Sequence, residues 1–332
     1  MDARRLLAHA ARSAEYAELR AEGRRGAVRY GAKVSESTVR DLLAQAVQSL
    51  SADRATVEAR REAELLLQHA LRVDRAWLFA HADDVADRVL AGQFRCYVSR
   101  RAEGEPVAYI TGRREFFSLD LAVTSDVLIP RVETELLVEL ALEKIPPDAA
   151  MRIADLGTGS GAIALALAHE RPRSRVLATD ASAAALDVAR GNATRLGLLN
   201  VEFARGEWCA ALGELRFGLI ASNPPYIAAG DAHLGRGDLR FEPALALSSG
   251  ADGLDAIRTI THDARRHLEP GGWLLFEHGY DQGAAVRDIF AANGYAEAAT
   301  AQDLEGRDRV SLASYTGAHA MLDPSPPPTP RT

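Results

Sequence analysis

Four consecutive residues, Asn223-Pro224-Pro225-Tyr226, carry the clearest chemical signal in this chain. They follow the apolar stretch 219–222, which has the composition of a buried strand. The two prolines fix φ and remove two backbone donors, so the loop presents acceptors, namely the Asn223 side-chain oxygen and the Pro224 carbonyl. Two such acceptors can hold the hydrogens of a planar NH2 group, and Tyr226 can stack on its plane. The loop therefore predicts a binding site for an amide or an aryl amine.

Binding an NH2 group in this way suits one kind of reaction. An amide nitrogen is a poor nucleophile because its lone pair is delocalised. Acceptors that hold its hydrogens orient the nitrogen, and methyl transfer from a sulfonium then needs positioning more than a strong base. We assign Asn223, Pro224 and Tyr226 as candidate catalytic residues, and all four loop residues, Pro225 included, as candidate substrate-binding residues. An ordinary Asn-Pro turn is the alternative, and the glycine loop and strand-end acid earlier in the chain argue against it.

A glycine-rich loop, Gly157-Thr158-Gly159-Ser160-Gly161, separates a strand-like stretch from a helical one. Glycines let the backbone turn tightly and approach a ligand closely, and the start of the helix offers unpaired N–H groups. We assign these five residues as candidate cofactor-binding residues. The alternative, in which the glycines serve only a tight turn, does not account for the acid that follows in register.

The acids beside this loop indicate a nucleoside cofactor. Asp180 ends an apolar stretch, where its carboxylate can accept hydrogen bonds from both hydroxyls of a ribose. The spacing Gly157-x-Gly159-x-x-Ala162, with Asp180 at the expected distance, formally satisfies the dinucleotide fingerprint. S-adenosylmethionine sites use a similar turn with an acid just before the first glycine, the place that Asp155 occupies. The loop alone leaves both cofactors open, and the later Asn-Pro-Pro-Tyr loop favours S-adenosylmethionine.

These candidate residues need a scaffold that brings the ends of strands together. In the C-terminal two-thirds of the chain, apolar strand-like segments alternate with helical ones. Strands separated by helices imply parallel pairing with right-handed crossovers. We therefore predict an α/β fold with a doubly wound, Rossmann-like, seven-stranded sheet. The predicted strands span residues 152–156, 175–179, 201–204, 219–222, 273–277, 296–301 and 309–314.

The segment before the sheet has a different period. Apolar residues at helical spacing predict a small helical bundle over residues 38–112, and the β-rich run after it predicts a β-hairpin linker over 113–130. We expect the methyltransferase domain over 131–316. The flanking segments are expected to be an extension of uncertain order over 1–37 and a disordered, proline-rich tail over 317–332.

Composition excludes several classes of protein. The 332 residues are 47% apolar and 26% charged, as in a globular protein, and the apolar runs are too short to cross a membrane. The first residues lack the apolar core of a secretory signal, so we expect a cytoplasmic protein without a membrane partner. Cys96 and Cys209 build neither a disulfide framework nor a thiolate site, and no His/Asp/Glu cluster has metal-ligand spacing, so we expect no metal.

The charges are distributed unevenly along the chain. The net charge is +3 over residues 1–37, −1 over residues 38–112 and −9 over residues 113–332. A protein that grips a polyphosphate backbone usually shows a basic footprint. The distribution therefore argues for a protein substrate and against direct contact with nucleic acid.

The glycine loop, Asp180 and the Asn-Pro-Pro-Tyr loop together resemble class I S-adenosylmethionine-dependent methyltransferases that act on a planar NH2 group. More specifically, about residues 38–316 resemble the peptide chain release factor glutamine N5-methyltransferases, the HemK/PrmC family. The sequence departs from that family at Val132-Glu133, where Pro-Asp is usual, and at Gly218, where an aspartate is common. The resemblance also includes the segments 105–110, 129–135, 240–243 and 277–279.

This resemblance implies a reaction and its partners. S-adenosyl-L-methionine would be the methyl donor, with S-adenosyl-L-homocysteine as the product. The acceptor would be the side-chain amide nitrogen of the glutamine in the Gly-Gly-Gln motif of class 1 release factors, which act in translation termination. The helical domain would recognise and hold the release factor.

The resemblance also implies roles for single residues. The loop 157–161 would bind the methionine part of the cofactor, Asp180 its ribose and Trp208 the adenine region, and Asn223 would contact both cofactor and acceptor. Residues near the cofactor entrance would be Arg131, Thr134 and Glu135, and Glu242 would shape the loop beside the site.

Other interpretations remain open at this point. The reaction could be glutamine methylation of a ribosomal protein or adenine-N6 methylation of DNA or RNA; a module without catalysis and a NAD oxidoreductase are more distant alternatives. Trp208 could merely cap a hydrophobic edge, Cys209 reads as a structural thiol, and His278 reads as a satisfied polar residue at a strand end. Glu277 is equally consistent with a structural and a functional role.

Overall fold

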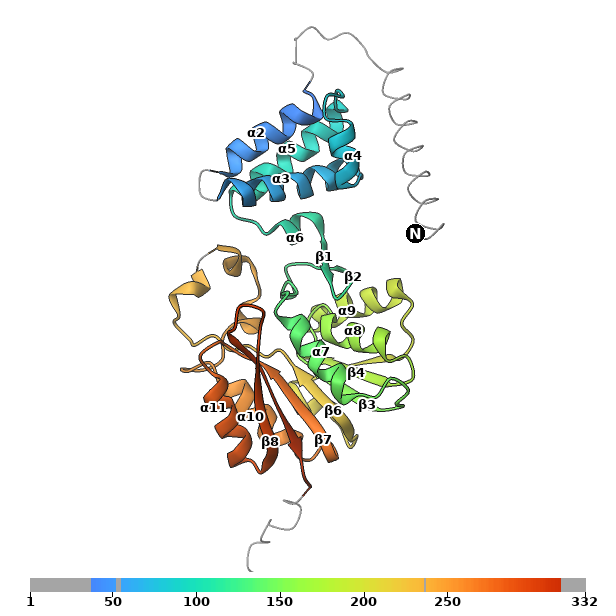
Figure 1. The fold of residues 1–332 in the computed structure, drawn as a ribbon, viewed down its shortest axis with the longest axis vertical. Coiled ribbons are helices and arrows are strands. Elements are labelled where there is room, and N and C mark those ends of the chain that lie inside the picture. Colours follow the sequence, from blue (N-terminus) through green and yellow to red (C-terminus); the bar gives the residue numbers. More distant parts are fainter. Residues whose placement is uncertain (1–36, 52–54, 236, 318–332) are drawn as a thin grey trace, which may run out of the picture. The chain divides into compact units, whose positions relative to one another are not determined.

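The computed structural model describes residues 37–51, 55–235 and 237–317 and divides the chain into two compact units, with the boundary between Thr111 and Gly112 (Figure 1). The predicted extension over 1–36 and the tail beyond residue 317 lie outside the described residues. None of the helices in the described residues is long and apolar enough to cross a membrane.

The first unit is built from helices alone. Its core consists of apolar side chains at helical spacing, among them Leu42, Leu66 and Phe94, all at most 1% exposed. Four helices follow the predicted stripes, and a fifth after Pro106 was not predicted, because five residues are too few to show a period. The helices are α2 (Val39–Leu50), α3 (Thr56–Leu71), α4 (Arg75–Ala80), α5 (Arg88–Ala102) and α6 (Val107–Thr111).

A β-hairpin opens the second unit. Strands β1 (Arg113–Phe116) and β2 (Leu119–Ala122) pair antiparallel, and the turn residues Phe117 and Ser118 both have positive φ. The hairpin is therefore shorter than the predicted span 113–130, and the turn lies inside the β-rich run. Neither turn residue is a glycine, so the sequence held no ordinary signal for this turn.

The predicted α/β class and seven-stranded sheet are confirmed. The strand order is β5-β4-β3-β6-β7-β9-β8; β3 to β7 pair in parallel, and β9 runs antiparallel to both β7 and β8. The strands are β3 (Arg152–Leu156), β4 (Arg175–Asp180), β5 (Val201–Arg205), β6 (Phe217–Ser222), β7 (Leu268–Glu277), β8 (Tyr295–Gln302) and β9 (Asp308–Tyr315).

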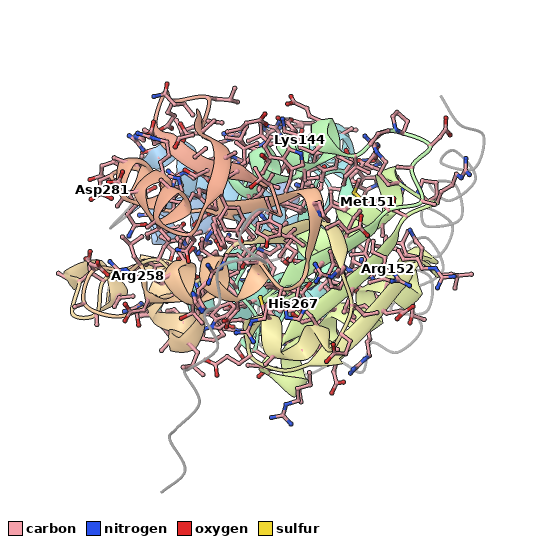
Figure 2. All side chains as sticks on the ribbon, turned by 90° about the horizontal axis from the view of Figure 1, so that it is seen from below. Lys144, Met151, Arg152, Arg258, His267 and Asp281 are labelled. Atoms are coloured by element: carbon pink, nitrogen blue, oxygen red, sulfur yellow. The ribbon has the colours of Figure 1, made fainter. Side chains whose placement is uncertain are left out.

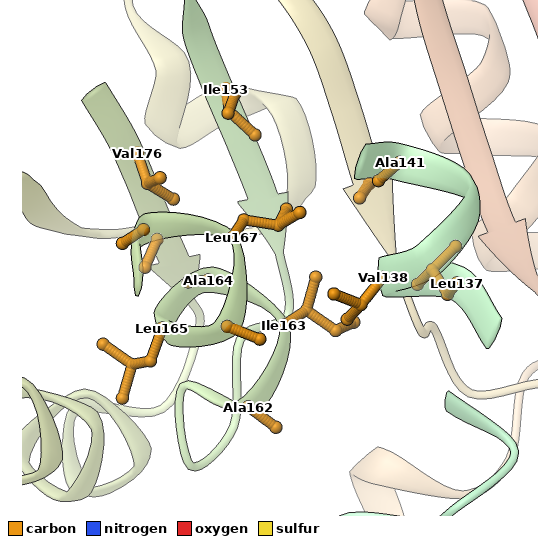
Figure 3. Close-up of a cluster of buried hydrophobic side chains, with 14 of the residues drawn as sticks. Leu137, Val138, Ala141, Ile153, Ala162, Ile163, Ala164, Leu165, Leu167 and Val176 are labelled. Carbon is orange, nitrogen blue, oxygen red and sulfur yellow. The ribbon is translucent and has the colours of Figure 1, made fainter. Parts of the chain in front are cut away.

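Helices cover both faces of this sheet. On β3, Ile153 packs into one hydrophobic cluster with α7 and α8, whereas Ala154 and Leu156 pack into a second cluster with α10 and α11. In Figure 3, Val138 of α7 and Ile163 of α8 point toward one another within the first cluster. The helices are α7 (Thr134–Lys144), α8 (Ala162–Glu170), α9 (Ala183–Leu196), α10 (Asp255–Ala264) and α11 (Gly283–Ala292), with short 3-10 turns η1 (Trp208–Leu212), η2 (Ala232–Gly235), η3 (Gly237–Phe241) and η4 (Ala244–Ala246).

Strand β7 departs furthest from its predicted bounds. Strand β7 starts at Leu268, five residues before the predicted start, because Leu268 pairs with Phe217 although Pro270, Gly271 and Gly272 read as a turn. Gly218, where the resembled family has an aspartate, lies inside β6. A Cβ at Gly218 would lie 2.7 Å from Cγ and Sδ of Met151, which is labelled in Figure 2. The methionine therefore fills the space that a larger residue would need.

Candidate active site

A cavity of about 580 Å³ lies at the carboxyl ends of the parallel strands. Chain order reverses between β3 and β6, which are neighbours in the sheet, so the loops that follow these two strands meet at the topological switch point. The predicted residues that line the cavity are Arg131, Thr134, Gly157, Thr158, Gly159, Ser160, Asp180, Trp208, Asn223 and Pro225. The fold thus brings the glycine loop and the Asn-Pro-Pro-Tyr loop to one cavity.

The glycine loop depends on backbone conformations that favour glycine. Gly157, Gly159 and Gly161 have φ of 72°, 56° and 87°. A Cβ at Gly157 would lie 3.3 Å from the ring of Trp208, and a Cβ at Gly161 would lie 2.9 Å from Leu165. Gly157 and Gly159 line the cavity, whereas Gly161 precedes α8 and is not part of the lining.

Asp155 holds this loop from inside the protein. Its Oδ2 accepts from the Thr158 hydroxyl (2.6 Å) and from the backbone N–H of Ala164 (3.1 Å). Among the described residues, its Oδ1 is a fully buried atom with no hydrogen-bond partner. Burial raises the pKa of Asp155 to about 7, although both hydrogen bonds oppose the shift.

Asp180 ends β4 and faces the cavity. Its Oδ2 accepts from the backbone N–H of Gly159 (2.9 Å) and its Oδ1 from that of Ser182 (2.8 Å). Each carboxylate oxygen keeps a further acceptor position. Trp208 opens η1 on the cavity wall with φ of 45°. An acceptor and an aromatic ring on one cavity suit the ribose and the base of a nucleoside.

Asn223 follows β6 and begins a partly buried chain of hydrogen bonds. Its Nδ2 donates to the Thr134 hydroxyl (3.2 Å), which donates to Oε2 of Glu277 (2.5 Å). The Tyr226 hydroxyl donates to Oε1 of the same carboxylate (3.1 Å), and Gln282 donates to the Tyr226 carbonyl (3.0 Å). The Asn-Pro-Pro-Tyr loop is therefore tied to α7 and to the end of β7.

Two residues of this loop do not line the cavity. Pro224 is buried, and Tyr226 points its hydroxyl at Glu277, so neither is among the lining residues, whereas Asn223 and Pro225 are. Burial and the carboxylate of Glu277 raise the pKa of Tyr226, so the phenol stays protonated at neutral pH.

The sequence is equally consistent with a structural and a functional role for Glu277. Glu277 is 1% exposed at the end of β7, and burial raises its pKa, while the hydrogen bonds from Thr134 and Tyr226 and the nearby Arg309 oppose the shift. The available signal was its place at a strand end, the same signal that singled out Asp180. A sequence cannot show that its carboxylate reaches both α7 and the loop after β6.

The remaining predicted residues lie at the margin of the site. Arg131 lines the cavity and donates to Oε2 of Glu242 (2.5 Å), whose Oε1 accepts from the backbone N–H of Ile129 (3.1 Å). The Glu242 side chain is fully buried and outside the cavity lining; burial raises its pKa, and the charge of Arg131 opposes this. The carboxylate therefore joins the loop after η3 to the segment before α7.

Glu135, which is expected near the cofactor entrance, contacts the hairpin turn. It is not among the residues that line the cavity, and its Oε1 accepts from the backbone N–H of Phe117 (2.8 Å) in the hairpin turn. The reason is its position on α7: it lies one residue beyond Thr134 and therefore faces another direction on the helix. Glu135 stabilises the hairpin turn.

The other singled-out residues have structural environments. His278 contacts the Gly279 carbonyl through Nδ1 (2.8 Å) and the Ser311 hydroxyl through Nε2 (2.8 Å), and burial lowers its pKa. Cys209 is 3% exposed, and burial raises the pKa of its thiol to about 12, so it is inert at neutral pH. In the described part of the chain, no group of three His, Cys, Asp or Glu residues could hold a metal ion.

Known proteins provide an independent comparison. Residues 41–112 match the family model of the PrmC N-terminal domain, and residues 133–237 match that of the methyltransferase small domain. The chain is 57% identical over 258 residues to a release factor glutamine methyltransferase of Xylella fastidiosa, a match that covers 78% of this chain and 94% of the relative. The protein of the same name from Coxiella burnetii is 48% identical over 271 residues, with 81% and 97% covered.

Similarity to solved structures concerns the fold. The hMettl16 catalytic domain, solved in complex with the MAT2A 3′UTR hairpin 1, superposes with a TM-score of 0.50 at 16% identity, covering 73% of this chain and 85% of that one. At this identity the match shows a shared methyltransferase fold. The sequence relatives, which match along most of their length, show the family. The chain belongs to the family of release factor glutamine methyltransferases.

Proposed function

We propose that this protein transfers a methyl group from S-adenosyl-L-methionine to the side-chain amide nitrogen (N5) of the glutamine in the Gly-Gly-Gln motif of class 1 release factors. One observation carries the proposal. Asn223, which follows β6, and the glycine loop, which follows β3, line the same cavity. In this proposal a planar-amide site and a nucleoside site adjoin, as methyl transfer to an amide requires. The relatives' names, which specify release factors and glutamine, support the substrate.

The residues of the cavity fit S-adenosyl-L-methionine. A Cβ at Gly157 would lie 3.3 Å from the Trp208 ring, so the absence of a side chain lets the glycine loop approach this ring closely at the cavity wall. In this proposal the loop 157–161 holds the methionine part, Asp180 accepts from the ribose hydroxyls and Trp208 contacts the adenine. When bound, this cofactor supplies an electrophilic methyl group on a sulfonium.

The acceptor side of the site positions an amide and needs no strong base. In this proposal Asn223 Oδ1 accepts a hydrogen of the substrate NH2 and orients the nitrogen toward the methyl donor. The carbonyl of Pro224, a residue outside the cavity lining, is the expected second acceptor. Both oxygens of Glu277 are engaged by Thr134 and Tyr226, and Glu277 does not line the cavity. Glu277 is therefore not placed to take a proton from the substrate.

The two units divide the work in this proposal. The helical unit recognises and holds the release factor, while the α/β unit carries out the transfer. Residues 113–332 carry a net charge of −9, which favours a protein partner over nucleic acid. Glutamine methylation of a ribosomal protein and adenine-N6 methylation remain as outcomes of the test.

The test is a methyl-transfer assay with mapping of the product. The purified protein is incubated with methyl-labelled S-adenosyl-L-methionine and the release factors of its own organism, and labelled peptides are identified by mass spectrometry. The matched control is a release factor whose Gly-Gly-Gln glutamine is replaced. Label on that glutamine alone is the expected result. Label on ribosomal protein or nucleic acid, with none on release factors, contradicts the proposed substrate.

A further inference from the structure

A hydrogen-bonded chain of four polar side chains, of which Thr134 and Glu277 are buried, runs from the cavity to the end of β7. It consists of Asn223, Thr134, Glu277 and Tyr226, joined by contacts of 3.2, 2.5 and 3.1 Å. Asn223 and Thr134 line the cavity, whereas Glu277, 1% exposed, lies behind them. These side chains come from three separate elements, α7, β7 and the loop after β6, so their meeting is a property of the tertiary structure alone.

The chemistry of these groups gives the chain a direction. Both carboxylate oxygens of Glu277 accept from hydroxyl groups, Oε1 from Tyr226 and Oε2 from Thr134, so the Thr134 hydroxyl donates its one proton to Oε2. Because its only proton is donated to Glu277, the Thr134 oxygen can only accept a hydrogen bond from Asn223. Asn223 must therefore turn its NH2 group, and not its oxygen, toward Thr134.

The other end of the Asn223 carboxamide is thereby determined. Because Nδ2 donates to Thr134, Oδ1 points away from the hydrogen-bonded chain of side chains. Within the described residues, Oδ1 has no hydrogen-bond partner. A carboxamide has nearly the same shape after a 180° flip, so packing alone does not distinguish the two orientations. The flipped side chain would present NH2 to the NH2 of the substrate, where two donors cannot bond.

We propose that Glu277 and Thr134 are positioning residues that fix the orientation of the Asn223 carboxamide, so that its oxygen faces the substrate amide. This inference rests on the proposed function, because it assumes a substrate NH2 group at Asn223. It assigns to Glu277 an indirect role, exerted through Thr134.

The test compares two substitutions at Thr134 that differ only in the hydroxyl. Thr134→Val keeps the shape and removes the hydroxyl, whereas Thr134→Ser keeps it. We expect Thr134→Val to lower kcat for release-factor methylation on the order of 10- to 100-fold, the loss typical of a misplaced catalytic group. Thr134→Ser should keep kcat within about threefold of wild type. Both should bind S-adenosylhomocysteine like wild type.

Thr261→Val is the matched control. Thr261 is a fully buried helical threonine of α10 whose hydroxyl donates to the Ile257 carbonyl (2.7 Å), and it does not line the cavity. This variant should keep the wild-type kcat. The comparison then shows whether the loss of activity comes from removing any buried hydroxyl or specifically from removing the Thr134 hydroxyl that contacts Asn223. Circular dichroism and S-adenosylhomocysteine affinity establish that each variant is folded.

Glu277→Gln provides a second, independent variant. A glutamine can accept from Thr134 or donate to it, so the direction is no longer imposed, and we expect kcat to fall with S-adenosylhomocysteine affinity unchanged. Wild-type kcat in Thr134→Val or in Glu277→Gln, or equal losses in the valine and serine variants, would overturn the inference. If the wild-type protein methylates no release-factor glutamine, the proposed function itself fails.

Discussion

The buried carboxylate of Asp155 holds the conformation of the glycine loop through hydrogen bonds. It accepts from Thr158 and Ala164 and so fixes the loop that begins at Gly157, while its Oδ1 finds no partner among the described residues. Its pKa of about 7 lies above the ordinary value of 3.8. Between these values the folded protein holds a proton that the unfolded chain has lost, so this group makes stability fall as the pH rises.

Asp155→Asn should therefore stabilise the ligand-free protein at high pH. The amide oxygen can still accept from Thr158 and Ala164, and the buried charge is gone. We expect a higher unfolding temperature than wild type at pH 8, with the difference shrinking toward pH 5, where Asp155 is protonated. Thermal unfolding from pH 5 to 8.5 measures this, with the exposed Asp288→Asn as control. A difference independent of pH would contradict the assignment.

Asn223 is the residue on which the proposed chemistry depends. Asn223→Ala removes the side-chain acceptor and should lower kcat at least about 100-fold, as loss of a preorganised hydrogen-bond partner does. Binding of S-adenosylhomocysteine should persist, because the loop 157–161 and Asp180 are untouched. Isothermal titration and the labelled-methyl assay measure the two quantities. An active Asn223→Ala protein would show that the reaction takes place elsewhere.

At the scale of elements, the glycine loop and η1 approach each other across the cavity wall. Gly157 has φ of 72°, and a Cβ there would lie 3.3 Å from the Trp208 ring. Gly213, at the other end of η1, has φ of 58° with nothing within 4 Å of its ideal Cβ, and it does not line the cavity. Alanine would introduce backbone strain at either position, because both have positive φ. Only at Gly157 would its methyl group also contact a neighbouring side chain.

Alanine substitutions at Gly157 and Gly213 distinguish the effect of backbone strain from the effect of crowding at the cavity wall. Gly157→Ala should weaken S-adenosylhomocysteine binding about tenfold or more, because the methyl group displaces Trp208 and intrudes on the loop. Gly213→Ala should lower the unfolding temperature and leave the affinity unchanged, since only strain is added. Calorimetric titration and thermal unfolding of both variants give the comparison. Equal affinities for the two variants would argue against a ligand at Gly157.

The hairpin shows a limit of reading elements from sequence. Phe117 and Ser118 adopt positive φ without glycine, and Glu135 of α7 accepts from the Phe117 amide (2.8 Å). A contact over 18 positions thus supports a turn that local propensity disfavours. Glu135 could be recognised as a candidate from sequence, but its partner could not, because the partner depends on how the hairpin packs against α7.

At the scale of the whole molecule, the helical unit has exposed apolar side chains that are not part of its hydrophobic core. Phe79 of α4 is 58% exposed, and its ring lies 5.5 Å from the guanidinium carbon of Arg75. Exposed aromatic residues are frequent anchors in protein interfaces. In the proposed division of work, such a residue contributes to holding the release factor and not to the transfer itself.

Phe79→Ser tests that division. We expect KM for the intact release factor to rise about five- to tenfold, the effect of one aromatic contact, with kcat and S-adenosylhomocysteine affinity unchanged. Leu304→Ser is the matched control, since Leu304 is a fully exposed leucine in the α/β unit between β8 and β9. A wild-type KM for Phe79→Ser would exclude Phe79 from the docking surface.

The sequence by itself determined the fold class and the two loops at the cavity. Alternating strand and helix segments predict a parallel sheet, and turn chemistry marks the loops 157–161 and 223–226. These features are local: period, glycine and proline each act within a few residues. The same locality explains why α6 and the early start of β7 escaped prediction.

Only the tertiary structure decided how distant side chains pair. It joined Asn223 to Thr134 and Glu277, Arg131 to Glu242, and directed Tyr226 away from the cavity lining. The physical reason is that a hydrogen bond depends on positions and directions of atoms in space, which sheet order and helix packing set. A sequence names the donors and acceptors, and the fold chooses the partners.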